Sequence, residues 1–206
     1  MKEITIGLLN NTEGSAKFVN GDTIVVASVV GPKESVRSNI LCDIDIKWSI
    51  DSDTRDSQHA EYRRFLKKIL ESLIIRSKYP RTTVTVSITV LRNDGSVLST
   101  ACNAAVMALV DCGVAMKGLA STTECAVIDN NLVFNPNKKE ESDALCTMFS
   151  SWSSISQDLV ACQTSGLTTR EQFMEILSKS NGPAKETLAY LRLSYETKCK
   201  KMLLKE

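Results

Sequence analysis

Histidine is almost missing from this sequence of 206 residues, in which His59 is the only one. Serine and cysteine nucleophiles are commonly activated by a histidine base, and zinc sites usually combine histidine with closely spaced cysteine pairs. The seven cysteines include no CxxC pair, and the nucleophile motif GxSxG does not occur. The sequence therefore argues against a Ser/His or Cys/His enzyme and against a structural metal, and it predicts buried, reduced thiols.

Long hydrophobic runs and an excess of one charge are also missing. No apolar stretch approaches the ~20 residues that cross a bilayer, and Met1–Gly7 lacks the apolar core of a secretion signal. Lys+Arg 25 and Asp+Glu 24 leave a formal net charge of +1, whereas proteins that bind nucleic acid by bulk attraction are strongly basic. We therefore expect a soluble intracellular protein whose contacts with nucleic acid are local or shared with partners.

The first fifty residues alternate between polar and apolar side chains, which is the pattern of half-buried β-strands. Asn20-Gly21-Asp22 is typical of a hairpin turn, and Gly31-Pro32 ends the strand that follows it. We therefore expect an antiparallel meander with strands over residues 3–9, 16–19, 23–30 and 39–50.

The period then changes to that of helices. Between Ser57 and Ile74, apolar residues recur at i, i+3, i+4 and i+7, which predicts an amphipathic helix. The β-branched run Thr82–Leu91 predicts a central strand. The alanine-rich segment Val97–Asp111 predicts a helix that packs closely on a sheet and is ended by Gly113.

The final third repeats this order of strands followed by helices. Thr168–Glu171 resembles a capping box that opens a helix, and Pro183 suits the first position of a further helix. The expected strands cover residues 122–128, 132–134, 144–150 and 155–162, and the helices cover 170–178 and about 183–202. We therefore predict an α+β fold with one domain, residues 1–206, in which mixed and antiparallel sheets pack against helices.

A local basic cluster accompanies the predicted helix that starts near Ser57, on the side away from its apolar stripe. Positive charges at helical spacing suit a phosphate backbone, but a solvated outer face uses the same residue types. Both interpretations stay open from composition alone. The cluster consists of Arg55, Arg63, Arg64, Lys67 and Lys68.

Two polar segments are further candidates. Asn93–Thr100 runs into a helix N-terminus, where free N–H groups can bind an anion, but it lacks the GxxxxGK[ST] and GxGxxG motifs. Its alternative is an ordinary turn capped by Asp94 or Ser96. Asn135–Asp143 offers carboxylates for a divalent metal, yet its interleaved lysines and amides also fit a solvated charged turn.

Short motifs follow one another in the order of a known family. Near the start they are Gly14-Ser15-Ala16, Gly21-Asp22-Thr23, Val25–Val29 and Gly31-Pro32, and later they are Asp94-Gly95, Asn103-Ala104-Ala105 and Asp111-Cys112-Gly113. Taken together with the basic helix over Glu61–Ile74, they resemble the RNase PH family over most of the chain. The variant is most similar to the small, non-catalytic RNase PH-type ring subunits of the eukaryotic RNA exosome. The resemblance implies an RNase PH-like domain of the ribosomal protein S5 domain 2 type.

The resemblance also implies which reaction the family catalyses and which residues for that reaction are replaced in this sequence. Active members use inorganic phosphate to attack the 3′-terminal phosphodiester of RNA, two arginines hold that phosphate, and carboxylates bind Mg²⁺. The family's helix arginine falls on Lys68, its turn arginine falls on Leu98, and its acids fall on Asn135 and Asn137. The implied degenerate active site consists of Lys68, Leu98, Ser99 and Asp143, the last being the nearest remaining acid.

An aliphatic side chain cannot replace a guanidinium fork, and lysine replaces it only in part. Each preorganised charge that is lost from such a site costs roughly 10²–10³ in rate. We therefore expect little or no phosphorolysis, no catalytic residue, no bound metal and no cofactor.

The resemblance thus implies a structural, RNA-binding subunit of the exosome ring in 3′-to-5′ RNA processing and decay, including ribosomal RNA processing. Its expected partners are other RNase PH-like subunits and RNA, without a membrane, in the nucleus, the nucleolus and the cytoplasm. The alternative is a free-standing homodimeric nuclease that acts on RNA or DNA, including DNA degradation in cell death. An unrelated β-sheet protein that shares only the turns is a third interpretation.

Overall fold

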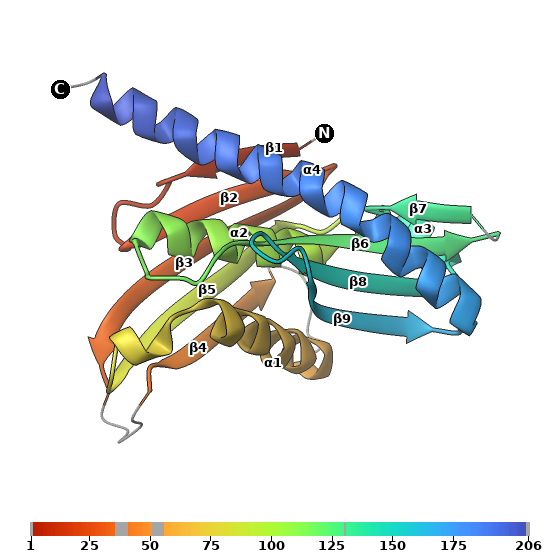
Figure 1. The fold of residues 1–206 in the computed structure, drawn as a ribbon, viewed down its shortest axis with the longest axis horizontal. Coiled ribbons are helices and arrows are strands. Elements are labelled where there is room, and N and C mark those ends of the chain that lie inside the picture. Colours follow the sequence, from red (N-terminus) through yellow and green to blue (C-terminus); the bar gives the residue numbers. More distant parts are fainter. Residues whose placement is uncertain (1, 36–40, 51–55, 130, 205–206) are drawn as a thin grey trace.

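Two β-sheets and three long helices build the structure, a computed structural model that describes residues 2–35, 41–50, 56–129 and 131–204. Helices α1 (Asp56–Leu73) and α2 (Val97–Cys112) pack between the sheets, and α4 (Arg170–Leu203) covers the outer face of the second sheet (Figure 1). The predicted α+β class with sheets packed against helices is confirmed.

The first sheet has five strands in the order β1-β2-β3-β5-β4. They are β1 (Lys2–Ile6), β2 (Gly14–Asn20), β3 (Thr23–Glu34), β4 (Asp43–Ile50) and β5 (Thr82–Arg92). Strands β1, β2 and β3 are antiparallel as expected, but β4 pairs with β5 in parallel at one edge. The predicted meander is therefore wrong for β4, because α1 joins β4 to β5 as a crossover that returns the chain in the same direction.

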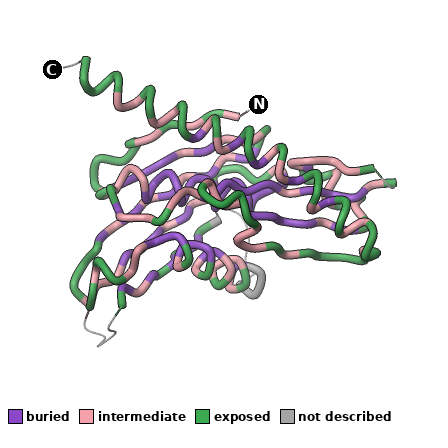
Figure 2. Tube along the Cα trace, in the orientation of Figure 1, coloured by how far each residue is buried: buried purple, intermediate pink, exposed green. Residues whose placement is uncertain are grey.

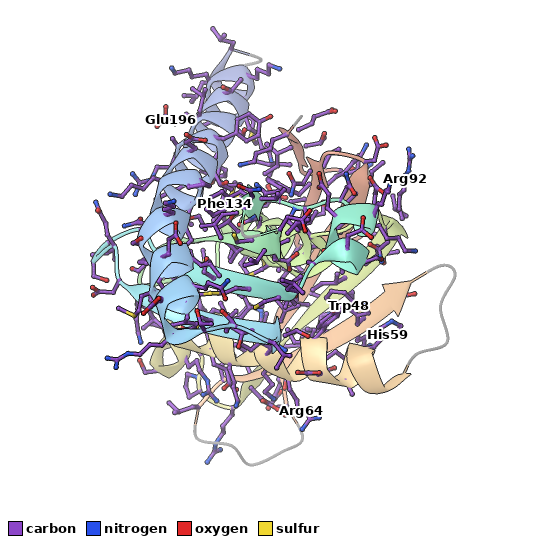
Figure 3. All side chains as sticks on the ribbon, turned by 90° about the vertical axis from the view of Figure 1, so that its right-hand side faces the viewer. Trp48, His59, Arg64, Arg92, Phe134 and Glu196 are labelled. Atoms are coloured by element: carbon purple, nitrogen blue, oxygen red, sulfur yellow. The ribbon has the colours of Figure 1, made fainter. Side chains whose placement is uncertain are left out.

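Helix α1 packs its apolar stripe toward the first sheet, and Leu66, Ile69 and Leu70 are buried as their spacing predicts. The short 3-10 helix η1 (Arg76–Lys78) follows it. The sequence places His59 in a polar helix start, but the side chain is only 8% exposed. Figure 3 shows His59 on the same side of the molecule as Trp48 of β4, whereas Arg64 points outward.

Helix α2 is the centre of the molecule and is buried from Val97 to Leu109 (Figure 2). It contacts β2 and β3 on one side and β6 (Ala120–Ile128) on the other. Its alanines permit this double contact, as the sequence predicts. Gly14 permits the closest approach, because a Cβ there would lie 2.4 Å from Ala108 O and 2.4 Å from Cys112 N.

The second sheet is antiparallel and has the strand order β7-β6-β8-β9. Besides β6, its strands are β7 (Asn131–Phe134), β8 (Cys146–Ser153) and β9 (Leu159–Gly166). The four predicted strands are present, but the last begins at Leu159 because residues 154–158 form a turn. The charged segment before β8 is not only a turn: it contains the short helix α3 (Lys138–Asp143).

Helix α4 runs without a break, although the sequence predicts two helices there. Pro183 removes a backbone donor, but Gly182 before it has no Cβ to collide with the proline ring, so the helix continues. Buried residues on both sides of the proline, such as Ile176 and Leu191, hold one continuous face against the structure. The capping box begins at Thr169, one residue later than predicted.

Among the described residues, no helix is both long enough and apolar enough to span a membrane.

The close approach of β2 to α2 yields a stability prediction. Gly14→Ala forces a Cβ against the backbone of α2, and we expect a loss of about 1–3 kcal/mol in the free energy of unfolding. Lys139→Ala is the control, since this side chain is exposed on α3, and we expect a change below about 0.5 kcal/mol. Urea unfolding monitored by circular dichroism measures both. Equal losses in the two variants would contradict the close packing at Gly14.

Candidate functional site

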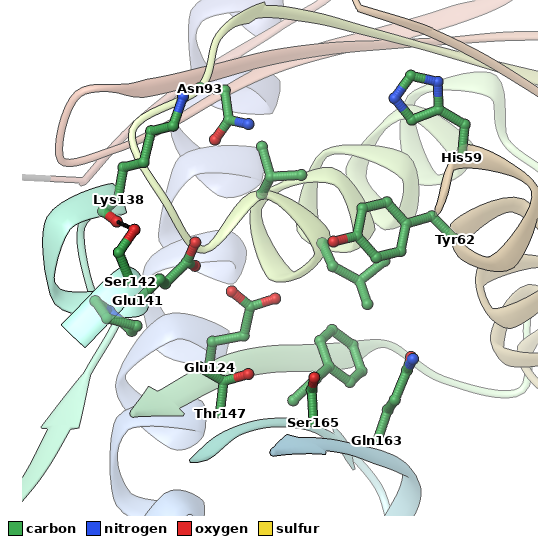
Figure 4. A pocket seen from close by; sticks show the side chains of 14 residues that line it. His59, Tyr62, Asn93, Glu124, Lys138, Glu141, Ser142, Thr147, Gln163 and Ser165 are labelled. Atoms are coloured by element: carbon green, nitrogen blue, oxygen red, sulfur yellow. Dashed lines mark hydrogen bonds between the residues drawn. The ribbon is translucent and has the colours of Figure 1, made fainter. Parts of the chain in front are cut away.

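A cavity of about 420 Å³ opens beside the N-terminus of α2, between α1, α3 and the second sheet (Figure 4). Tyr62 and Phe149 form part of its wall. Figure 4 shows Glu124 and Glu141 on the other side of the cavity from Tyr62. The lining includes His59, Tyr62, Asn93, Leu98, Glu124, Lys138, Glu141, Thr147, Phe149, Gln163 and Ser165. Residues of six helices and strands, α1, α2, β6, α3, β8 and β9, therefore meet at one site.

The N-terminus of α2 is capped by glutamates from outside the helix. The N-cap residue Ser96 has a left-handed backbone (φ 48°), and its hydroxyl donates to Pro136 O at 2.9 Å instead of capping the helix. The backbone N–H of Ser96 donates to Glu141 Oε1 at 2.5 Å, and that of Ser99 donates to Glu124 Oε1 at 3.2 Å. The expectation that a side chain of the turn itself caps this helix is wrong for Ser96.

Helix α3 and strand β6 hold these two carboxylates in place. A reciprocal capping box starts α3, with Glu140 N donating to Asn137 Oδ1 at 2.9 Å and Asn137 N donating to Glu140 Oε2 at 2.7 Å. This short helix presents Glu141 to α2. Glu124 is fixed by the pairing of β6 with α2, in which Thr122 N donates to Asn103 Oδ1 at 3.0 Å.

The environment favours the neutral form of both acids. Burial raises the pKa of Glu124 to about 8, and the nearby charge of Glu141 adds to the rise, while hydrogen bonds from Ser99 and Ser96 oppose it. Burial also raises the pKa of Glu141, and the N–H of Ser96 is the main opposing influence. The two carboxylates thus share a partly dry site in which the N–H groups of the helix are the stabilising donors.

Leu98 and Ser99 lie in the first turn of α2. Leu98 lines the cavity and is 5% exposed. The Ser99 hydroxyl donates to Ser96 O at 3.0 Å, within the helix turn, and the residue is buried. An aliphatic side chain therefore lines the cavity beside the start of α2, and its correspondence to the family's turn arginine stays a prediction.

Lys68 and Asp143 lie apart from that cavity. Lys68 is exposed and lines a neighbouring hollow of α1 and β9, together with Arg64 and Cys162. Asp143 is exposed at the end of α3 and is not among the residues that line the cavity. The structure thus brings Leu98 and Ser99 together but separates both from the other two predicted residues.

The predicted carboxylate segment does not converge on one point either. Asn135 Oδ1 accepts from Asn20 Nδ2 at 3.4 Å, and Asn137 caps α3. In the described part of the chain, no three His, Cys, Asp or Glu residues cluster as metal ligands would. That no metal or cofactor binds stays a prediction.

Only some side chains of the basic cluster on α1 are exposed and without an ion pair to a described residue. Lys67 forms an ion pair with Asp43 at 2.8 Å, Arg63 is half-buried, and Arg64 and Lys68 are exposed. Arg55 lies outside the described residues. A role of these side chains in RNA binding stays a prediction.

The sequence analysis missed Glu124 and most of the cavity wall, and it included Glu141 only as part of the candidate segment Asn135–Asp143. Glu124 offers a usable signal, because it is the one charged residue of the strand segment Ala120–Ile128. A carboxylate in such a strand requires donors, and the start of a neighbouring helix supplies them. Tyr62 and Phe149 carry no such signal, since buried aromatic residues are found throughout protein cores.

Glu124 predicts a pH-dependent stability. Between about pH 4.5 and 8 the folded chain retains a proton on Glu124 that the unfolded chain has lost, so the contribution of this group to stability falls as pH rises. Glu124→Gln is always neutral and still offers an oxygen to Ser99 N–H. We therefore expect the variant to gain stability relative to the wild type as pH rises through this window.

Urea unfolding of both chains across this pH range measures the effect. Glu196→Gln, on an exposed part of α4, is the matched control and should follow the wild type. A constant difference between Glu124→Gln and the wild type at all pH values would contradict the raised pKa of Glu124.

Comparison with known proteins identifies the family to which the chain belongs. The profile of the 3′ exoribonuclease family, domain 1 (RNase PH), matches residues 2–115. A protein of Arabidopsis thaliana named exosome complex exonuclease RRP46 homolog is 38% identical over 138 residues, which are 65% of this chain and 58% of the relative. A Caenorhabditis briggsae protein named putative exosome complex component RRP41 is 34% identical over 152 residues, 68% of this chain and 63% of the relative. This chain thus spans less than two thirds of the length of these curated relatives.

Solved structures share the fold over almost the whole chain. The crystal structure of rice (Oryza sativa) Rrp46 has a TM-score of 0.88 and 28% identity, covering 93% of this chain and 92% of that one. An archaeal exosome core has a TM-score of 0.81 and 22% identity, covering 93% of this chain and 86% of that one, which shows the fold alone. Because the family profile matches more than half of the sequence and the fold agrees throughout, the chain belongs to the RNase PH family.

Proposed function

We propose that this chain is a structural, RNA-binding subunit of an exosome ring, with no phosphorolytic activity of its own, in 3′-to-5′ RNA processing and decay. Other RNase PH-type subunits are its ring neighbours, and the nucleus, the nucleolus and the cytoplasm are its compartments. The names of the plant and nematode relatives support membership of an exosome. The match to rice Rrp46 over nearly the full length of both chains supports the same assignment.

The capping of α2 by Glu124 and Glu141 is the observation that carries the non-catalytic part of the proposal. A phosphate at a helix N-terminus needs free N–H donors and a positive field. Here the N–H groups of Ser96 and Ser99 already donate to Glu141 and Glu124. Leu98 adds no positive charge at the same place. Two donors of the helix start are thus occupied and an aliphatic side chain stands beside them, which disfavours phosphate at this site.

The α1 surface supports the RNA-binding part. Arg64 and Lys68 are exposed on one helix face four residues apart, which suits contacts with successive phosphates. Lys67 contributes less, because its charge is paired with Asp43. One archaeal relative in fold is described as an exosome with RNA bound to its active site, which makes RNA a reasonable ligand for this architecture.

A nuclease assay tests the proposal. The purified chain is incubated with unstructured RNA and Mg²⁺, with and without inorganic phosphate, and released nucleoside diphosphates are measured. We expect a phosphate-dependent rate at least roughly 10²–10³ below that of an active RNase PH-type enzyme assayed in parallel. Phosphate-dependent release that Lys68→Ala and Asp143→Asn abolish would contradict the proposal and favour the free-standing nuclease.

Affinity capture from cell extract tests the ring assignment separately. The tagged chain is expected to copurify with several other RNase PH-type subunits, and Lys68→Ala should copurify with them equally well. Recovery of this chain with itself alone would favour the homodimer instead.

A further inference from the structure

A second, smaller cavity lies between the middle of α4 and the end of the second sheet, away from the site at α2. Its volume is about 220 Å³. One wall comes from β6, β8 and the turn before β9, and the other comes from α4, which crosses this sheet in Figure 1. The polar residues that matter here are Ser121, Trp152, Gln157, Asn181, Lys185 and Arg192.

One buried donor on the sheet side lacks an acceptor. Ser121 and Trp152 are directly opposite each other on β6 and β8, so their side chains share the face that α4 covers. Trp152 Nε1 is buried without an acceptor among the described residues. Ser121 is 1% exposed, and its hydroxyl offers a second donor beside the indole. Buried donors are normally paired, so the missing acceptor at Trp152 Nε1 points to a ligand that supplies one.

Two cations on the helix side lack counter-ions. Lys185 and Arg192 are seven residues apart on α4, so they lie on the same side of the helix two turns apart. Both are exposed, and neither forms an ion pair with any described residue. Other lysines of α4 do form ion pairs: Lys179 with Glu175 at 2.7 Å, and Lys198 with Asp111.

The chemistry of this cavity is that of an anion site. We propose that it binds a phosphate group, with Lys185 and Arg192 supplying charge and Ser121 and Trp152 supplying hydrogen bonds. Arginine and lysine are the usual phosphate ligands, and the side-chain amides of Asn181 and Gln157 add further donors at the rim. This site shares no residue with the surfaces at α1 and α2 on which the proposed function rests. An experiment can therefore contradict one proposal and leave the other intact.

A phosphate group can come from free inorganic phosphate or from an RNA backbone, and one experiment separates these sources. The indole N–H resonance of Trp152 in ¹⁵N-labelled protein is identified by its loss in Trp152→Phe. Inorganic phosphate and, separately, an oligouridylate with hydroxyl ends are titrated at constant ionic strength. We expect a saturable shift of the Trp152 resonance with at least one of them. Saturation at lower concentration by the oligouridylate assigns the site to the RNA backbone, and a response to phosphate alone assigns it to the free ion.

Matched double variants separate a specific site from general charge. Lys185→Ala with Arg192→Ala should weaken the apparent Kd at least roughly tenfold, because two charged contacts are lost. Lys200→Ala with Lys201→Ala removes the same charge from the end of α4, outside this cavity, and should leave the Kd unchanged. Arg64→Ala with Lys68→Ala should likewise leave the phosphate response unchanged. A Trp152 resonance that neither ligand moves, or equal weakening by the two α4 double variants, would overturn the proposal.

Discussion

The hydrogen bonds from the start of α2 to Glu124 and Glu141 are the interaction on which this account depends. Helix α2 is buried along most of its length between two sheets, so its first N–H groups have little access to water and require acceptors inside the protein. Glu124 of β6 accepts from Ser99, and Glu141 of α3 accepts from Ser96. These contacts tie the second sheet to the central helix and at the same time determine what the cavity can bind.

The cavity therefore differs in character from a phosphate site built on the same helix. Its two glutamates occupy N–H donors that an anion would need, and Leu98 lines the cavity together with Tyr62 and Phe149. Burial raises the pKa of Glu124 to about 8, so the site has reduced negative charge at neutral pH, and Lys138 lies in its wall. The proposed role as a ring subunit agrees with the exposed charges on α1 and the exposed cations Lys185 and Arg192 on α4.

Local periodicity made much of the fold predictable, because the apolar stripe of α1 and the alternation of β3 depend only on neighbouring residues. The parallel pairing of β4 with β5 could not be predicted from this periodicity, because it depends on the direction in which the crossover through α1 returns the chain. The continuity of α4 through Pro183 depends on one buried face that spans the proline. In the site, Leu98 was a candidate residue and lines the cavity, whereas Glu141 lay in a segment whose composition also fits a solvated turn. Its role arises only when α3 forms and meets α2.

The most direct test of the central claim is to observe the start of α2 itself. The backbone amide resonances of Ser96 and Ser99 in the labelled wild-type chain are followed while inorganic phosphate is added at constant ionic strength and pH. If Glu124 and Glu141 occupy these donors, both resonances stay fixed at millimolar phosphate, whatever happens at the cavity beside α4. A saturable shift of either resonance would show that phosphate displaces a carboxylate, and it would contradict the account.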